Sequence, residues 1–470
     1  MYIEQIYTGC LAQAAYYLEH NGEAAVVDPL RDVTAYVKKA RERNATIKYI
    51  FETHFHADFV SGHLELAKAT GATIVFGPTA KPEFFALTAK DEQEFTLGNV
   101  TIKVLHTPGH TMESCCYLLY NEKGEEAMLF TGDTLFLGDV GRPDLAQKAG
   151  LSQEELGGML YDSLRNKILP LPDHVVIYPA HGAGSACGKN MSTEKYDTLG
   201  HQKQVNYALD PRLTKEEFIK EVTTGLTKPP QYFPHNVAIN KKGYRSLDEI
   251  IRAAKPLTAE QFAAVTKAEE TLILDTRPAP QFVKGHIPGS VNIGLDGDFA
   301  PWVGALVNDI EQAIAIVCEE GKEQEVVIRL TRVGYDNAIG YLEGGYSAWA
   351  EAGYPADTIS CIDAEKLADL LEEKPVATLL DVRRKSEYDS EHVIGAENLP
   401  LNYINDRMDE LDTDVTYFVY CAAGYRSVIF ISILQARGLR NLVNINGGFN
   451  AIKRNGRLFL SKYQQPTTML

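Results

Sequence analysis

Long apolar segments and cysteine pairs are both missing from this sequence of 470 residues. No apolar run approaches the ~20 residues that a transmembrane helix needs, so we expect no membrane-spanning segment. The seven cysteines are widely scattered and form no CxxC pair, which excludes a disulfide framework in a chain of this length. The first residues also lack a basic stretch followed by an apolar one, so we expect no signal peptide and a cytoplasmic location.

Positive charge is also in short supply. The 46 Lys and Arg residues stand against 63 Asp and Glu residues, which gives a net charge of −17. Such an acidic surface repels phosphate backbones and anionic lipids, so neither nucleic acid nor a membrane is an expected partner, although a local basic pocket for a small anion is compatible with it. Apolar residues make up 45% and charged residues 23%, which is typical of a soluble globular protein. The length predicts about three domains.

Residues 1–200 alternate short apolar runs with loops that are rich in His, Asp and Gly. Together with apolar residues at helical spacing, this pattern predicts an α/β domain. Open α/β folds build their sites where strands end, and the polar residues recur at those ends. Residues 201–255 are less regular and are interrupted by prolines 229, 230 and 234, which predicts a connector with one or two helices.

The rest of the chain contains an internal repeat of about 100 residues. In each copy a His follows an Asp-x-Arg segment, 11 residues after the Asp, and a Cys precedes a Gly-Gly pair by 26 residues. The matched residues are Asp275, His286, Cys318 and Gly344 in one copy and Asp381, His392, Cys421 and Gly447 in the other. The repeat predicts two similar doubly wound α/β domains, at residues 256–356 and 360–470.

Histidines and acidic residues gather in tight turns at the predicted strand ends of the first domain. The motifs are Thr-His-Phe-His-Ala-Asp at 53–58, Pro-Gly-His at 108–110, Thr-Gly-Asp at 131–133 and Pro-Ala-His at 179–181. A lone His is usually capped or solvated, but four such motifs in loops of the same kind favour a metal site. Imidazole and carboxylate groups are both metal ligands, and neither is stable when buried without a partner.

These motifs resemble the metallo-β-lactamase superfamily over residues 1–200, which implies an αββα sandwich. Two-metal hydrolases of that superfamily carry a His directly after the HxHxD aspartate, and here Phe59 takes that place. The stretch through Asp133 and the following Gly-Asp-Val-Gly-Arg-Pro-Asp segment is similar to the persulfide dioxygenase branch. That resemblance implies one mononuclear Fe(II), no organic cofactor, and the ligands His54, His110 and Asp133.

A face of two His and one carboxylate leaves open positions on iron for a substrate sulfur and for O₂. Zinc on the same ligands could activate water but could not reduce O₂. On this interpretation His56, Asp58 and His181 orient the ligands or hold water, while a direct ligand role for His56 is left open.

Cys421 begins the segment Cys-Ala-Ala-Gly-Tyr-Arg-Ser, between an apolar β run and a helical one. A loop in that place can direct backbone N–H groups at one sulfur, which stabilises a thiolate or a bound persulfide. Arg426 adds positive charge for an anionic acceptor. With Asp381, Glu387 and His392 upstream, this repeat resembles a rhodanese domain, which implies that Cys421 carries a persulfide.

Cys318 occupies the matching place in the first copy, where carboxylates replace the arginine and two alanines that follow Cys421. Glu323 stands at the position of Arg426, and Glu319 and Glu320 replace two alanines. Nearby carboxylates oppose thiolate formation and repel anionic sulfur acceptors. This copy therefore resembles a degenerate rhodanese that has lost sulfur transfer, and we expect it to act as a scaffold or docking surface.

Two further residues of the first domain are candidates for substrate binding. Cys187 follows His181 in a Gly-rich loop, and Lys189 beside it could favour a thiolate near the iron. Arg142 lies in a Gly/Pro turn shortly after Asp133. A lone Arg is usually solvated or ion-paired, whereas the resemblance implies a place near the anionic portion of the substrate thiol.

The order of the three domains resembles bacterial fusions of a persulfide dioxygenase with a degenerate and an active rhodanese. The resemblance implies oxidation of a low-molecular-weight thiol persulfide by O₂ to sulfite, followed by rhodanese transfer that gives thiosulfate, a route of sulfide detoxification. The expected partners are that persulfide, O₂ and sulfite; the identity of the thiol and a homo-oligomeric state are left open. The alternatives are a zinc-dependent, glyoxalase-II-like thioester hydrolase with rhodanese sensing modules, and a non-catalytic sulfur relay with little O₂ consumption.

Overall fold

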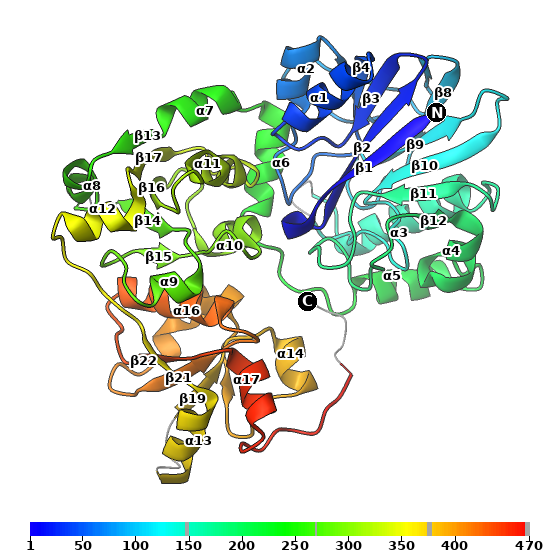
Figure 1. Cartoon of the computed structure of the whole chain (residues 1–470). Coiled ribbons are helices and arrows are strands. Elements are labelled where there is room, and N and C mark those ends of the chain that lie inside the picture. Colours follow the sequence, from blue (N-terminus) through cyan, green and yellow to red (C-terminus); the bar gives the residue numbers. More distant parts are fainter. Residues whose placement is uncertain (146–149, 268–269, 374–377, 466–470) are drawn as a thin grey trace. The chain divides into compact units, whose positions relative to one another are not determined.

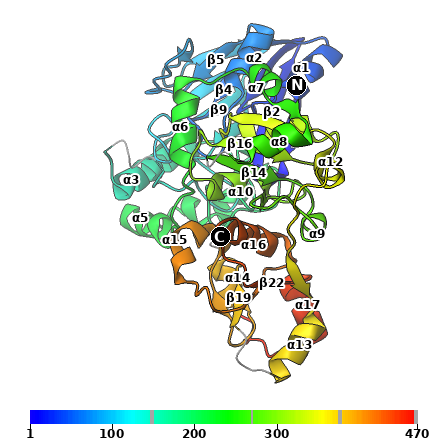
Figure 2. The ribbon, with the colours of Figure 1, turned by 90° about the vertical axis from the view of Figure 1, so that its left-hand side faces the viewer.

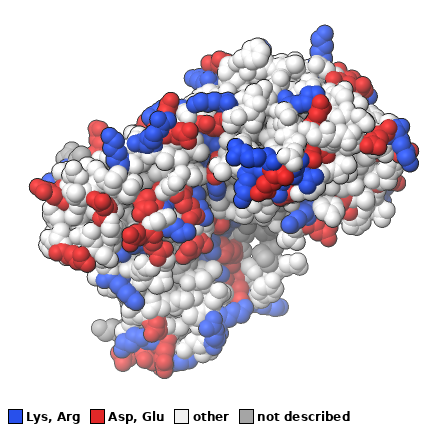
Figure 3. All heavy atoms as spheres, turned by 45° about the horizontal axis from the view of Figure 1, so that its top comes forward, with Lys and Arg blue, Asp and Glu red and all other residues white. Residues whose placement is uncertain are grey.

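The structure is a computed structural model that describes residues 1–145, 150–267, 270–373 and 378–465. The chain forms two compact units, the first holding Met1–Leu247 and the second beginning at Asp248. Each unit contains two β-sheets, which can be followed in Figures 1 and 2. No helix among the described residues is long and apolar enough to cross a membrane. Acidic and basic side chains are interspersed over the face shown in Figure 3.

The first sheet has six strands in sequential order, antiparallel from β1 to β3 and parallel from β3 to β6. Its strands are β1 (Tyr2–Thr8), β2 (Gln13–His20), β3 (Glu23–Val27), β4 (Thr46–Glu52), β5 (Thr73–Phe76) and β6 (Leu87–Thr88). Parallel strands need crossover connections, and α1 (Thr34–Glu42) and α2 (His63–Thr70) supply two of them.

The second sheet also has six strands, in the order β12-β11-β10-β9-β8-β7. Only β10 and β11 run parallel, and the long crossover between them carries α3 (Gln153–Ser163). The strands are β7 (Glu94–Leu97), β8 (Val100–His106), β9 (Cys115–Tyr120), β10 (Glu126–Gly132), β11 (Val176–Pro179) and β12 (Asp197–Thr198). In β8 buried Val and Ile alternate with half-buried Thr and Lys, the period of a strand with one face in a core.

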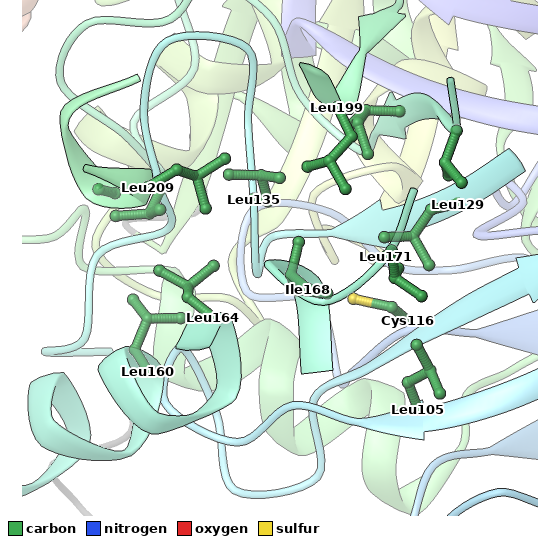
Figure 4. Close-up of a cluster of buried hydrophobic side chains, with 14 of the residues drawn as sticks. Leu105, Cys116, Leu129, Leu135, Leu160, Leu164, Ile168, Leu171, Leu199 and Leu209 are labelled. Atoms are coloured by element: carbon green, nitrogen blue, oxygen red, sulfur yellow. The ribbon is translucent and has the colours of Figure 1, made fainter. Parts of the chain in front are cut away.

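The two sheets pack face to face and helices cover their outer faces. One apolar cluster lies between the sheets and joins side chains such as Tyr16 and Phe51 of the first sheet to Tyr117 and Phe130 of the second. A second cluster packs α1 and α2 on the first sheet. A third packs α3, α4 (Leu199–Val205) and α5 (Lys215–Thr223) on the second sheet (Figure 4). The expected αββα sandwich is therefore confirmed.

The segment after residue 200 contains more helix than the one or two elements that its prolines suggested. Besides α4 and α5, it forms α6 (Phe233–Lys242) and α7 (Leu247–Ala253). A capping box of Thr214 and Glu217 begins α5, and the paired prolines 229 and 230 precede α6 instead of preventing it. Phe218 and Val222 of α5 are buried in the third cluster, so the part of this segment up to Leu247 belongs to the packed first unit.

The second unit contains two parallel five-stranded sheets with the same strand order. In the first repeat the order β13-β17-β16-β14-β15 joins β13 (Lys255–Leu257), β14 (Thr271–Asp275), β15 (Val291–Asn292), β16 (Ala313–Val317) and β17 (Ala338–Leu342). In the second repeat the order β18-β22-β21-β19-β20 joins β18 (Ser360–Ile362), β19 (Thr378–Asp381), β20 (Glu397–Asn398), β21 (Tyr417–Tyr420) and β22 (Leu442–Ile445). The internal repeat of the sequence thus corresponds to a repeat of the fold.

Helices alternate with these strands in both repeats. The first repeat has α8 (Ala259–Val265), α9 (Ala279–Phe282), α10 (Phe299–Leu306), α11 (Glu323–Thr331) and α12 (Gly345–Glu351). The second has α13 (Ala364–Glu373), α14 (Lys385–Ser390), α15 (Ile404–Arg407), α16 (Tyr425–Ala436) and α17 (Gly448–Asn455). Cys318 and Cys421 each follow the middle strand of their sheet and precede a helix, as the sequence pattern predicts.

Candidate metal and sulfur-transfer sites

Three ligand atoms meet at the edge of the sandwich, brought there by both sheets. His54 follows β4, His110 lies in the loop between β8 and β9, and Asp133 follows β10. Asp133 Oδ2 lies 3.9 Å from His54 Nε2 and 3.4 Å from His110 Nε2. All three side chains are buried, and Oδ2 has no hydrogen-bond partner among the described residues. The structure thus brings together the three residues that the sequence predicted as ligands.

Both histidines are held so that Nε2 faces Asp133. The Nδ1–H of His110 donates to the backbone carbonyl of Arg142 at 2.9 Å. Thr53 Oγ1 lies 3.0 Å from His54 Nδ1 and donates to Asp28 Oδ2 at 2.9 Å, so that His54 donates to the hydroxyl. An Nδ1–H tautomer leaves the lone pair of Nε2 available to a metal. Burial and the nearby His56 also lower the pKa of His54 well below its usual value.

His181 holds the other oxygen of Asp133. Its Nδ1 lies 2.8 Å from Asp133 Oδ1 and its Nε2 lies 2.8 Å from Asp58 Oδ2. Burial opposes protonation of this imidazole, but the two carboxylates raise its pKa to about 10. Burial likewise opposes ionisation of Asp133, yet His181 and the two facing histidines lower its pKa below the ordinary range. Asp133 is therefore an anion that presents Oδ2 to the site.

His56 lies next to this group but its Nε2 is directed to different carboxylates. It lies 3.1 Å from Asp28 Oδ1 and 3.4 Å from Glu52 Oε2. Burial opposes its protonation, but these two acids raise the pKa of His56 well above its usual value. A buried charge is stable only beside a partner of opposite sign, so we assign His56 to an ion-pair cluster with Asp28 and Glu52. Sequence reasoning had left its ligand role open and had not used Asp28 or Glu52.

A helix from far along the chain secures the loop that carries His54 and His56. The side-chain amide of Asn240, in α6, donates to the backbone carbonyls of His56 and Phe59, each at 2.8 Å. Its carbonyl oxygen accepts the backbone N–H of Ser61 at 2.9 Å. Asn240 is almost fully buried. The segment expected to be a connector thus fixes the path of the ligand-bearing loop.

Cys187 lies beside Asp58 and His181, and the three form a second group of potential ligand atoms within 4.8 Å of one another. Burial, with Asp58 and Asp133 nearby, raises the pKa of the Cys187 thiol well above its usual value. Lys189 does not offset this effect as the sequence suggested, because its amino group donates to the carbonyls of Glu221 and Thr224. Without a bound metal, Cys187 is a neutral thiol.

The guanidinium of Arg142 is fully engaged within the protein. It makes two hydrogen bonds to Asp144, at 2.6 and 2.7 Å, and donates to the carbonyls of Ala186 and Thr227. The backbone carbonyl of Arg142, in contrast, orients His110. The structure therefore shows Arg142 as a support of the ligand loop, while a contact with substrate stays a prediction.

Gly141 allows the close approach of that loop. A Cβ at this position would lie 2.1 Å from the carbonyl oxygen of Asp133 and 2.9 Å from His110 Nδ1. Both distances are shorter than those of real Cβ contacts, so a side chain at this position would displace the backbone of Asp133 and the ring of His110. The Gly-Arg pair after Asp133 thus shapes the site through its backbone.

The donor set fits a divalent transition metal. Two imidazole nitrogens and one carboxylate oxygen face one another, and Asp133 Oδ2 is buried without a partner among the described residues. Such a set suits iron or zinc and leaves further coordination positions free.

The candidate sulfur-transfer site lies in the loop after β21. Cys421 is buried, and the backbone N–H of Gly424 donates to its Sγ at 3.1 Å. Arg426 lies on the first turn of α16 and makes two hydrogen bonds to Glu387, at 2.5 and 2.8 Å. Burial opposes its charge, but Glu387 and Cys421 raise the pKa of Arg426. Arg426 is thus a permanent cation near the sulfur, with part of its charge balanced by Glu387.

The matching loop of the first repeat has the opposite electrostatic character. Burial raises the pKa of the Cys318 thiol to about 12, together with the negative charges of Glu323, Asp275 and Glu319. Two of these acids are the substitutions noted in the sequence. A cysteine that stays protonated is a poor sulfur nucleophile.

Comparison with known proteins agrees with this architecture. A model of the metallo-beta-lactamase superfamily matches residues 8–181, and a model of the rhodanese-like domain matches residues 258–352 and 363–455. The crystal structure of a metallo-beta-lactamase from Staphylococcus aureus is 31% identical, with a TM-score of 0.63 over 73% of this chain and 98% of its own. A probable hydroxyacylglutathione hydrolase of Schizosaccharomyces pombe is 29% identical over 45% of this chain and 88% of its own. Glyoxylase B2 of Dictyostelium discoideum is 29% identical over 48% of this chain and 78% of its own.

The chain belongs to the metallo-beta-lactamase superfamily, and two rhodanese-like domains follow that domain along the sequence. It is an enzyme of the metallo-beta-lactamase and rhodanese type with a candidate metal site in its first domain.

Proposed function

We propose that the first domain is a mononuclear Fe(II) persulfide dioxygenase and that Cys421 transfers sulfane sulfur to the sulfite it makes. One observation carries the proposal: His54, His110 and Asp133 direct three potential ligand atoms at a common point, while His56 is paired with Asp28 and Glu52. Phe59 stands where a further His would extend the set. Two His and one carboxylate are the ligands typical of non-heme iron oxygenases.

The overall oxidation balances as RSSH + O₂ + H₂O giving RSH + H₂SO₃. The outer sulfur loses four electrons and O₂ accepts them, and Fe(II) bound to the triad would supply the redox chemistry that Zn²⁺ lacks. The protein residues keep both imidazoles in the tautomer that ligates through Nε2, and His181 keeps Asp133 ionised. The burial of these groups excludes bulk water from the site.

The transfer step takes place at Cys421. Its thiolate attacks the outer sulfur of a second persulfide, the S–S bond breaks, and RS⁻ leaves. The sulfur lone pair of sulfite then attacks the outer sulfur of the Cys421 persulfide, and thiosulfate leaves with Cys421 restored as thiolate. The Gly424 N–H at 3.1 Å stabilises negative charge on this leaving sulfur. Tethering both domains in one chain raises the effective concentration of sulfite at the second site.

A second candidate is a zinc-dependent thioester hydrolase with rhodanese sensing modules. The curated relatives are named as a hydroxyacylglutathione hydrolase and a glyoxylase. Asp58, His181 and Cys187 also offer three ligand atoms beside Asp133, which a two-metal hydrolase would use.

One experiment separates these candidates. The protein is purified anaerobically, loaded with either Fe(II) or Zn(II), and its bound metal is counted. Each form is then given glutathione persulfide or a glutathione thioester. Iron-dependent O₂ uptake with about one metal per chain, and formation of sulfite or thiosulfate, supports the dioxygenase. Zinc-dependent thioester hydrolysis without O₂ uptake would refute it. Sulfur transfer with neither activity would favour a non-catalytic relay.

A further inference from the structure

Helix α16, which begins four residues after Cys421, is buried on all its sides. Every residue from Ser427 to Leu434 is buried. A helix that is apolar all round must be covered on more than one face. One cover is its own sheet, and the other is β15 of the first repeat, which lies against it in the same compact unit. The backbone N–H of Asn292, in β15, donates to Ser432 Oγ at 3.0 Å, with both residues buried.

A second contact between the repeats lies at the start of this helix, inside the cysteine loop itself. The hydroxyl of Tyr425 donates to the backbone carbonyl of Gly294 at 2.8 Å. The Tyr425 ring covers Gly297, where a Cβ would lie only 2.4 Å from the ring carbon that bears the hydroxyl. The first repeat therefore has a glycine at the point where the tyrosine of the second repeat needs room.

Tyr425 is joined directly to the residue that contacts the sulfur. Gly424 has φ 107, a conformation that favours glycine, and its N–H points at Cys421 Sγ. Ser427 Oγ also lies 3.6 Å from the sulfur and donates to Asn444 Oδ1 at 2.7 Å. A displacement of Tyr425 would thus rotate the peptide that donates to the sulfur.

We propose that the degenerate first repeat forms part of the Cys421 site, because its Gly294–Gly297 segment holds Tyr425 and thereby fixes the Gly424 N–H on the sulfur. Tyr425 is a positioning residue in this arrangement. The proposal rests on the sulfur-transfer role given to Cys421 above. It gives a function to a repeat whose own cysteine stays protonated.

The test uses the full chain and two measurements that need no natural substrate: sulfur transfer from thiosulfate to cyanide, and the rate at which iodoacetamide alkylates Cys421. Gly297→Ala places a methyl group against the tyrosine ring, and Tyr425→Ala removes the ring. We expect each to lower kcat about 10- to 100-fold with little change in KM, since a small displacement of a reacting group has this effect. Alkylation of Cys421 should slow in parallel. Tyr425→Phe keeps the ring contact and should recover most of the rate.

Gly285→Ala is the matched control. Its Cβ would lie 2.6 Å from the hydroxyl of Tyr346, so the same change strains the first repeat without touching Tyr425. We expect this variant to keep wild-type transfer and alkylation rates. Equal losses in the control, or wild-type rates in Gly297→Ala and Tyr425→Ala, would overturn the proposal. If Gly297→Ala fails to fold, the ratio of Tyr425→Phe to Tyr425→Ala still decides it.

The two proposals fail in different ways. If wild-type protein makes no thiosulfate from sulfite and a persulfide, the transfer function is wrong. The alkylation rates of Cys421 in the same variants still report whether the first repeat positions the loop.

Discussion

The hydroxyl of Thr53 connects the buried carboxylate of Asp28 to His54, a proposed metal ligand, so its removal should weaken metal binding. In Thr53→Val the shape of the side chain stays, but His54 Nδ1 loses its partner at 3.0 Å and Asp28 Oδ2 loses a donor at 2.9 Å. Loss of a group that orients a ligating His costs about 10- to 100-fold in metal affinity. At about 1.4 kcal/mol per factor of ten, this is roughly 1.4–2.8 kcal/mol of binding free energy.

The measurement is competition between the protein and a chelator of known affinity, with Fe(II) under anaerobic conditions and with Zn(II) in parallel. Thr276→Val is the matched control, since Thr276 is buried and its hydroxyl donates to a backbone carbonyl of the first repeat, far from any ligand in the sequence. Both variants should lose about 1 kcal/mol of stability from the missing hydrogen bond, but Thr276→Val should keep full metal affinity. Unchanged affinity in Thr53→Val would refute the reasoning that His54 is oriented through Thr53.

Three further predictions concern Cys421, His110 and Cys318. Cys421→Ser should spare O₂ uptake with a small persulfide and abolish thiosulfate formation; equal loss of both activities would mean that Cys421 takes part in the oxidation. His110→Ala should remove the metal and O₂ uptake while sulfur transfer by Cys421 survives; retained oxygenase activity would show that the ligands are wrong. Cys318 should be almost inert to iodoacetamide at pH 7, because a thiol with a pKa of about 12 is only about one part in 10⁵ thiolate there. Its labelling, read by peptide mass spectrometry, should rise with pH, and labelling at the rate of a free thiol would contradict the pKa.

The convergence of His54, His110 and Asp133 could be predicted because each of them stands in a turn at a strand end. His54, His110 and Asp133 sit after β4, β8 and β10, and strand ends are where α/β sheets bring separate segments together. The different electrostatic surroundings of Cys318 and Cys421 could also be predicted, since the charged residues that cause the difference lie close to each cysteine in the sequence. The repeat also predicted two similar α/β domains, and the last two sheets do have the same strand order.

The supports of the triad could not be predicted in the same way. The strand end at Asp28 was visible in the sequence, but its direction toward His56 depends on the packing of β3 against β4. The carbonyl of Arg142 acts through the backbone, which residue type does not report. Asn240 gave no signal, because an asparagine in a helix is ordinarily a surface residue.

The bonds from Asn240 to the loop of His56 and Phe59 span more than 180 positions of the chain. During synthesis these hydrogen bonds can therefore form only after α6, which follows the sandwich in the sequence, has left the ribosome. Contacts between such distant segments form late in folding, because a long stretch of chain must first be ordered. A nascent chain that stops before residue 240 would hold His54 on an unsecured loop. We therefore expect a chain that ends before residue 240 to fold its sheets but to retain metal poorly.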